Sequence, residues 1–127
     1  LELRRDLDWF AATETRAVEL TRELAREAQA GTLDDGGFAA RMEREVLPLW
    51  EQLAARAGRG YALAPDSPLA AVPDLLEGYA TARLNSARQF VAAARGQDAA
   101  ALERADRSAR EADELGGRLR EALARAR

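Results

Sequence analysis

Apolar residues recur at helical spacing through four long segments of the chain. Within each segment they follow one another in steps of three, four or seven, and Arg, Asp and Glu occupy the positions between them. This period is typical of amphipathic α-helices that bury one face. The pattern predicts helices over about residues 2–30, 34–57, 73–95 and 99–126.

Residues that favour helix ends occupy the breaks between these segments. Gly31 suits the left-handed position that follows a helix, and Thr32 with Asp35 has the spacing of a capping box for the second helix. Pro73 suits the first turn of the third helix, and Asp98 suits the cap of the fourth. The chain therefore has a stop or start signal at each predicted boundary.

The second segment contains Pro48 in its middle. A proline has no N–H to bond the carbonyl of Arg44, yet the apolar period continues on both sides, so we expect a kink and not an end. Residues 58–72 hold two Gly and two Pro, which predicts one long loop. The predicted fold is all-α: residues 1–127 form one domain, an antiparallel four-helix bundle of two αα-hairpins joined by that loop, with the second helix kinked at Pro48.

The fourth segment has the most regular pattern. Its apolar residues alternate steps of three and four from Leu102 to Ala126, as in a heptad seam with small side chains at its centre. We expect Ala109 and Ala112 to face another helix at close range. The arginines expected to face water are Arg107, Arg110 and Arg118.

The composition supports an all-α protein and restricts its chemistry. Of the 127 residues, 30 are Ala and 18 are Leu, which are strong helix formers, against 4 Val and no Ile. The chain has no His and no Cys, which excludes thiolate and imidazole catalysis, histidine phosphotransfer and the usual zinc, haem and di-iron sites. We therefore predict no catalytic residue, no metal, no cofactor and no enzymatic activity.

Charge and hydropathy restrict the partners. All 19 basic residues are Arg, they are spread along the chain, and the net charge is −3. Nucleic-acid binding usually needs a basic face, so we expect no nucleic-acid partner. No segment approaches the roughly 18 apolar residues of a membrane span, so we expect a soluble domain with no span within this chain.

Three aromatic residues are candidates for an interaction surface. Trp9 and Trp50 each lie one position off the apolar stripe of their helix, Trp50 next to Leu49, and Tyr61 lies in the long loop. Exposed Trp and Tyr are favoured anchors of protein interfaces, and the alternative is packing at the edge of the bundle. Arg83, at the margin of the third stripe, could hold an anion inside the bundle, although the head of such an arginine more commonly lies in water.

The second half of the chain carries a distinctive pattern of helix ends and small residues. The pattern comprises Pro73-Asp74-Leu75-Leu76, Tyr79, Arg83, Ala87, Gly96-Gln97-Asp98 and the Ala-rich last helix. This half resembles small helical ectodomains attached to bacterial membrane proteins or lipoproteins. The resemblance implies an extracytoplasmic accessory module and transfers no functional residue.

The sequence favours a non-catalytic helical interaction or accessory module with a protein partner or self-association. An exported or membrane-anchored parent would place it outside the cytoplasm, and a chain that begins with Leu1 instead of Met is compatible with a removed leader or anchor. The alternative is a small-molecule binder, with a pocket near the Pro48 kink. A third alternative, acid/base chemistry at Asp106 and Asp113, is weakened by the arginine that lies one turn from each.

Overall fold

A computed structural model describes residues 2–96 and 98–126. This part of the chain is helical and contains no strand. The second long helix is continuous although its middle turn is π-helical, so the predicted all-α fold with four long helices is confirmed. Its elements are α1 (Glu2–Gln29), α2 (Asp35–Arg41), the π-helical turn η1 (Met42–Val46), α3 (Leu47–Ala57), α4 (Val72–Gly96) and α5 (Ala99–Arg125).

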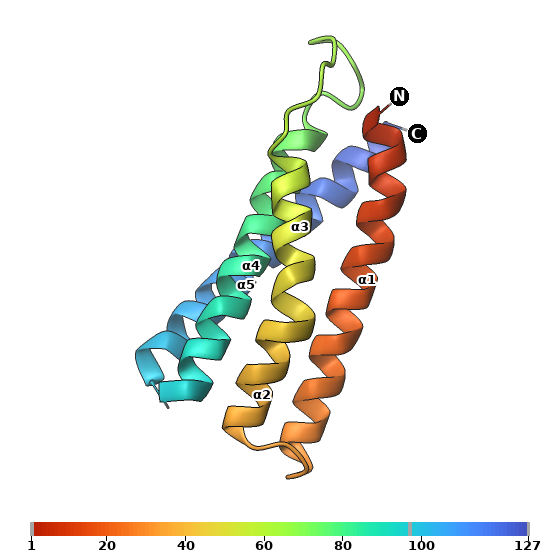
Figure 1. Cartoon of the computed structure of the whole chain (residues 1–127). Coiled ribbons are helices and arrows are strands. Elements are labelled where there is room, and N and C mark those ends of the chain that lie inside the picture. The colour runs from red at the N-terminus through yellow and green to blue at the C-terminus, as the bar shows by residue number, and fades with distance from the viewer. Residues whose placement is uncertain (1, 97, 127) are drawn as a thin grey trace.

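The helices run alternately up and down, as predicted, and each packs beside the next one along the chain (Figure 1). α1 packs along α2, η1 and α3, α3 packs on α4, and α4 packs along α5. Among the described residues, no Cα atom of α1 comes within 8 Å of a Cα atom of α4 or α5. The helices therefore form an open row, and its two ends, α1 and α5, approach each other only through side chains.

The helix caps agree with the sequence pattern at α5 and differ from it at α2. Asp98 caps α5 with its side chain, as predicted. At α2 the predicted capping box is wrong, because Asp34 accepts from the N–H of Gly37 at 2.7 Å. Thr32 instead donates its hydroxyl to the carbonyl of Glu27 at 3.1 Å, since the tight turn after α1 brings it back against that helix.

The kink predicted at Pro48 stays a prediction, and the irregularity that this helix shows is the π-helical turn η1, which ends two residues before Pro48. The N–H that follows η1 donates to the carbonyl of Met42, five residues earlier, which widens this turn. The wider turn matches a burial pattern with two successive steps of four, at Met42, Val46 and Trp50. Trp50 thereby takes the core position that the sequence pattern gave to Leu49, which is only half-buried.

The long loop, residues 58–71, is tied to the end of the bundle by Asp6. This residue is 4% exposed, and its carboxylate accepts from the hydroxyl of Tyr61 at 2.7 Å. It also lies 3.3 Å from Nε of Arg56, whose guanidinium is 4.8 Å from the centre of the Trp9 ring. Because a buried carboxylate needs such partners, this cluster joins α1, α3 and the loop.

The interface of α5 with α4 uses a face rotated from the predicted seam. Ala112 is fully buried, as predicted, but Ala109 is only half-buried and Leu102 is 46% exposed. The predicted close packing of Ala109 is therefore wrong, because Ala109 faces a hollow that it shares with residues of α1, and α1 does not come close. The three arginines expected to face water are exposed. The buried positions of α5 are Ala101, Ala105, Ala112, Gly116, Leu119 and Ala122.

Candidate binding groove

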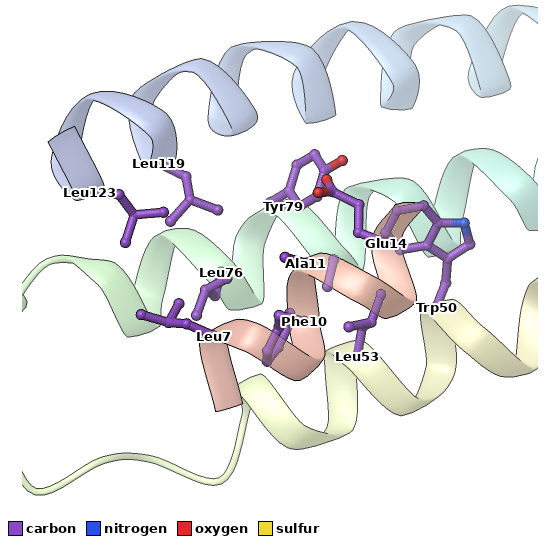
Figure 2. A pocket seen from close by; sticks show the side chains of 11 residues that line it. Leu7, Phe10, Ala11, Glu14, Trp50, Leu53, Leu76, Tyr79, Leu119 and Leu123 are labelled. Atoms are coloured by element: carbon purple, nitrogen blue, oxygen red, sulfur yellow. The ribbon is translucent and has the colours of Figure 1, made fainter. Parts of the chain in front are cut away.

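The space between α1 and α5 is an apolar groove, with α3 and α4 behind it. Towards the chain termini, side chains of all four long helices surround a hollow of about 90 Å³ (Figure 2). Its polar groups are the carboxylate of Glu14 and the hydroxyl of Tyr79. Its apolar lining includes Leu7, Phe10, Leu53, Leu76, Leu119 and Leu123.

A second, larger hollow of about 280 Å³ lies further along the groove. Here the start of α5 diverges from α1 (Figure 1), and α5 contributes only Ala109 to the lining. Met42 of η1 and Trp50 of α3 contribute from the continuous second helix, so this hollow lies beside the π turn and Pro48. The remaining lining residues come from α1 and α4: Val18, Thr21 and Arg22, and Arg83, Ser86, Ala87 and Phe90.

Trp50 is the wall that the two hollows share. Its side chain lines both, and its ring packs edge-to-face on Tyr79 with ring centres 6.0 Å apart and an interplanar angle of 79°. The π turn places Trp50 here by rotating it inward. Gly116 completes the arrangement, because a Cβ atom at this position would lie 3.1 Å from the Tyr79 ring.

A chain of polar side chains crosses the groove between the hollows. Burial, together with the nearby carboxylate of Glu14 of α1, raises the pKa of Tyr79 to about 12, so its hydroxyl stays protonated (Figure 2). Nε of Arg83 donates to this hydroxyl at 3.4 Å, and Nη2 donates to Asp113 of α5 at 2.7 Å. The hydrogen bonds of Arg83 thus connect α4 with α5, and Glu14 of α1 lies beside Tyr79, where α1 makes no backbone contact with the other two helices.

The structure separates the three aromatic residues predicted to form one interaction surface. Trp50 is 3% exposed and belongs to the core and the groove, so it is not a surface residue. Trp9 and Tyr61 are half-buried and belong to the cluster around Asp6 and Arg56 at the end of the bundle. A role for Trp9 and Tyr61 in binding a partner stays a prediction.

The contribution of α1 to the groove was not among the features predicted from the sequence. Glu14, Val18 and Arg22 follow one another in steps of four and line the two hollows. These residues lie beside the apolar stripe of α1. Their spacing of four residues is the sequence feature from which a second lining face of α1 could have been predicted. Arg83, by contrast, was singled out from the sequence, and it lies at the centre of the groove.

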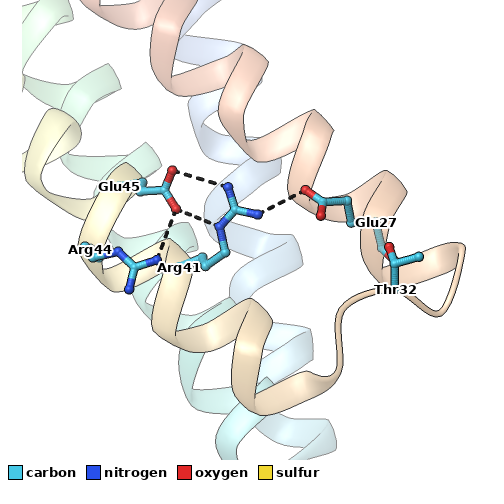
Figure 3. A network of polar contacts seen from close by, with 5 residues as sticks. All are labelled: Glu27, Thr32, Arg41, Arg44 and Glu45. Atoms are coloured by element: carbon cyan, nitrogen blue, oxygen red, sulfur yellow. Dashed lines mark hydrogen bonds and ion pairs between the residues drawn. The ribbon is translucent and has the colours of Figure 1, made fainter.

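A second polar cluster holds α1 beside η1 near the other end of the bundle (Figure 3). Arg41 donates to Glu45 at 2.7 and 3.3 Å and to Glu27 at 3.1 Å. Arg44 adds an ion pair with Glu45 at 3.6 Å. The hydrogen bond from Arg41 lowers the pKa of Glu45 and raises that of Arg41, so both stay charged. The groups of this cluster pair with one another, which indicates a structural role.

The groove offers apolar surface and guanidinium donors. Across the described ranges, no three or more His, Cys, Asp or Glu side chains are grouped so that they could hold a metal ion. Within the same ranges, no helix combines the length and apolar character that a membrane crossing requires. The groove lining therefore presents mainly apolar side chains, together with the guanidinium groups of Arg22 and Arg83.

Comparisons of the chain with protein-family models, curated proteins and solved structures return no match. The resemblance of the second half to helical ectodomains stays a prediction. A function for this domain has to be argued from the geometry of the groove.

Proposed function

We propose that this domain is a non-catalytic binding module that takes up a small molecule with an apolar body in the groove between α1 and α5. The observation that carries the proposal is the separation of these helices, beside which lie two apolar hollows of about 90 and 280 Å³. Close-packed protein interiors leave few voids larger than a water molecule. Ligand pockets are concave and mostly apolar with a few placed polar groups, and bundles host them between helices.

The dimensions favour a small molecule over a guest helix. A helix with its side chains is about 10–12 Å across, whereas the side chains of Glu14 and Tyr79 project into the groove and narrow it. The larger hollow, at about 280 Å³, is close to the roughly 300–1,000 Å³ of typical ligand pockets. Its position beside η1 is also consistent with binding, since π-helical turns recur at functional sites.

The single methionine of the chain gives a direct test. Met42 is 1% exposed and lines the larger hollow, so protein labelled at the methionine methyl has one reporter signal there. Octan-1-ol, a neutral probe with an eight-carbon body, should shift this signal until the site is saturated. Ala109→Leu should weaken binding because it places a side chain in the hollow. Ala124→Leu, at an exposed position of α5, is the matched control.

An unshifted Met42 signal in folded protein, up to the solubility limit of octan-1-ol, would reject the proposal. A shift that Ala109→Leu leaves unchanged would also count against it, because the probe would then bind elsewhere and act on Met42 indirectly.

Self-association through α5 is a second candidate function. Residues of α5 that are seven positions apart form a row along the open groove. Rows with this spacing form the contact face when two helices pair. The members of the α5 row are Leu102, Ala109, Gly116 and Leu123. Leu102 is 46% exposed and Ala109 and Leu123 are half-buried, whereas Gly116 is buried beside the Tyr79 ring. Sedimentation equilibrium should then detect a dimer that Leu102→Ser abolishes and Arg107→Ser preserves. A monomer at every concentration would exclude this candidate.

A further inference from the structure

The unused polar groups of the larger hollow are hydrogen-bond donors. The hydroxyl of Thr21 already donates to a carbonyl of α1 at 2.8 Å, and that of Ser86 donates to a carbonyl of α5 at 3.0 Å. The other polar side chains in the lining are the guanidinium groups of Arg22 and Arg83 and the indole N–H of Trp50. Among the described residues, none accepts a hydrogen bond from that indole.

We infer that the larger hollow binds an organic anion, a monocarboxylate with an apolar body, whose head lies between Arg83 of α4 and Arg22 of α1. The inference rests on the proposed function, because it specifies the ligand of the same hollow. Free donors on both sides of the space call for a ligand that accepts hydrogen bonds, and a carboxylate accepts several at once.

The charges of the hollow support an anionic ligand. Two guanidinium groups line it, and one carboxylate, that of Asp113, pairs with Arg83 at 2.7 Å. Arg22 makes no ion pair within residues 2–96 and 98–126. Its guanidinium is therefore without a carboxylate partner in the described part of the chain. A ligand carboxylate would neutralise it, and hydrogen bonds from guanidinium to carboxylate are among the stronger ones in proteins.

Arg83 is held in position without the ligand. Its side chain is 26% exposed, its guanidinium lies 5.4 Å from the centre of the Tyr79 ring, and both Nε and Nη2 are engaged. Its Nη1 group donates to no described residue, which leaves two N–H bonds for a ligand. Asp113 is 70% exposed, so it can turn into water if the anion takes its place. A donor that is already ordered loses little conformational entropy on binding.

The rest of the hollow suits the apolar body of such a ligand. Val18, Met42, Ala87, Phe90 and Ala109 surround this space. Contact with these side chains would provide affinity for any apolar chain, and the guanidinium groups would select a carboxylate head from a neutral one. The two contributions can therefore be measured separately with probes that share one chain.

The test compares octanoate with octan-1-ol, using the methyl signal of Met42 at low ionic strength. Octanoate should bind at least about tenfold more tightly than octan-1-ol, the factor that one good charge-assisted hydrogen bond provides. Arg83→Gln should lower the affinity for octanoate about tenfold or more and leave that for octan-1-ol unchanged. Arg22→Gln should act in the same direction with a smaller factor, because Arg22 is exposed.

Control variants distinguish failure of the anion inference from failure of the proposed binding function. Arg88→Gln, at an exposed position of α4 outside the hollow, should change neither affinity. If Arg83→Gln does not fold, Arg22→Gln decides, since an exposed side chain is dispensable for folding. Equal affinities for both probes, unaffected by either substitution, would overturn the anion inference and leave binding in the hollow intact. If neither probe shifts the Met42 signal, the proposed function fails as well.

Discussion

Two alanines on α5 provide a test of how the helix is packed. Ala112 has no exposed surface and lies in the core beside α4, whereas Ala109 lines the larger hollow. The sequence pattern alone places both in one seam and predicts that Ala→Leu is unfavourable at either position. The structure predicts opposite results, because only one of the two positions has space next to it.

The magnitudes follow from the surroundings of each side chain. At Ala112, three additional carbon atoms have to displace packed neighbours, which costs about 1–3 kcal/mol of the free energy of unfolding. At Ala109 the same atoms enter the hollow of about 280 Å³. Their burial contributes at most about 2.4 kcal/mol, at roughly 0.8 kcal/mol for each of the three carbon atoms, and partial exposure and the ordering of the leucine side chain, which costs about 0.5–1 kcal/mol, reduce this gain. Ala109→Leu should therefore leave the free energy of unfolding unchanged or raise it by about 1 kcal/mol.

Urea unfolding followed by circular dichroism measures both effects. With unchanged slopes, the midpoint should fall for Ala112→Leu and stay constant or rise for Ala109→Leu. Arg107→Ala is the control, because an exposed arginine contributes about 0.5 kcal/mol or less. A similar loss of stability in both leucine variants would refute the hollow beside Ala109, since that position would then be as tightly packed as Ala112.

Three further predictions concern the ends and the centre of the bundle. Asp6→Asn should lower the free energy of unfolding by about 1–3 kcal/mol in urea titrations, because it removes the carboxylate that pairs with Tyr61 and Arg56. An unchanged midpoint would contradict the role of this cluster. Burial and nearby carboxylates raise the pKa of both Tyr61 and Tyr79 to about 12, whereas an unfolded tyrosine ionises near pH 10. The unfolded state therefore releases these protons at lower pH than the folded state, and the free energy of unfolding should fall as the pH rises from about 10 towards 12. Phenolate absorbance of the folded protein that appears already near pH 10 would disprove this. Gly117→Ala should stabilise α5 by about 0.5–1 kcal/mol, whereas Gly116→Ala should not, because a Cβ atom at position 116 would lie 3.1 Å from the Tyr79 ring. Thermal unfolding of the two variants tests this, and equal stabilisation would contradict the position of the ring.

The helices and their approximate ends could be predicted from the sequence because local signals determine them. The apolar period set the helical segments, and Asp98 marked the start of α5 by a side-chain cap that acts within two residues. The start of α2 was harder to predict, since Thr32 and Asp34 are both good caps and the tight turn after α1 decides between them. We expected a kink at Pro48, and the structure shows an irregularity that ends two residues before it. The form that it takes, a π turn that buries Trp50, depends on the packing of the whole helix.

The groove could not be predicted in the same way. Periodicity shows that each helix has an apolar face, but it does not show which helices share a face or how closely they approach. In this domain the large side chains of Phe10, Trp50 and Tyr79 lie between α1 and α4, and α5 diverges from α1. The sequence pattern therefore identified the apolar face of α5 correctly. It was wrong about Ala109, which lines the hollow instead of packing closely against another helix.

One measurement tests most directly whether the groove between α1 and α5 holds a small anion beside Trp50. In a saturated complex of the protein with octanoate, intermolecular nuclear Overhauser effects report which side chains lie against the ligand chain. We predict effects between the octanoate methylene protons and the side chains of Met42 and Phe90, and their loss in Ala109→Leu. Overhauser effects from the bound ligand to other parts of the surface, with none to Met42 or Phe90, would contradict the proposal.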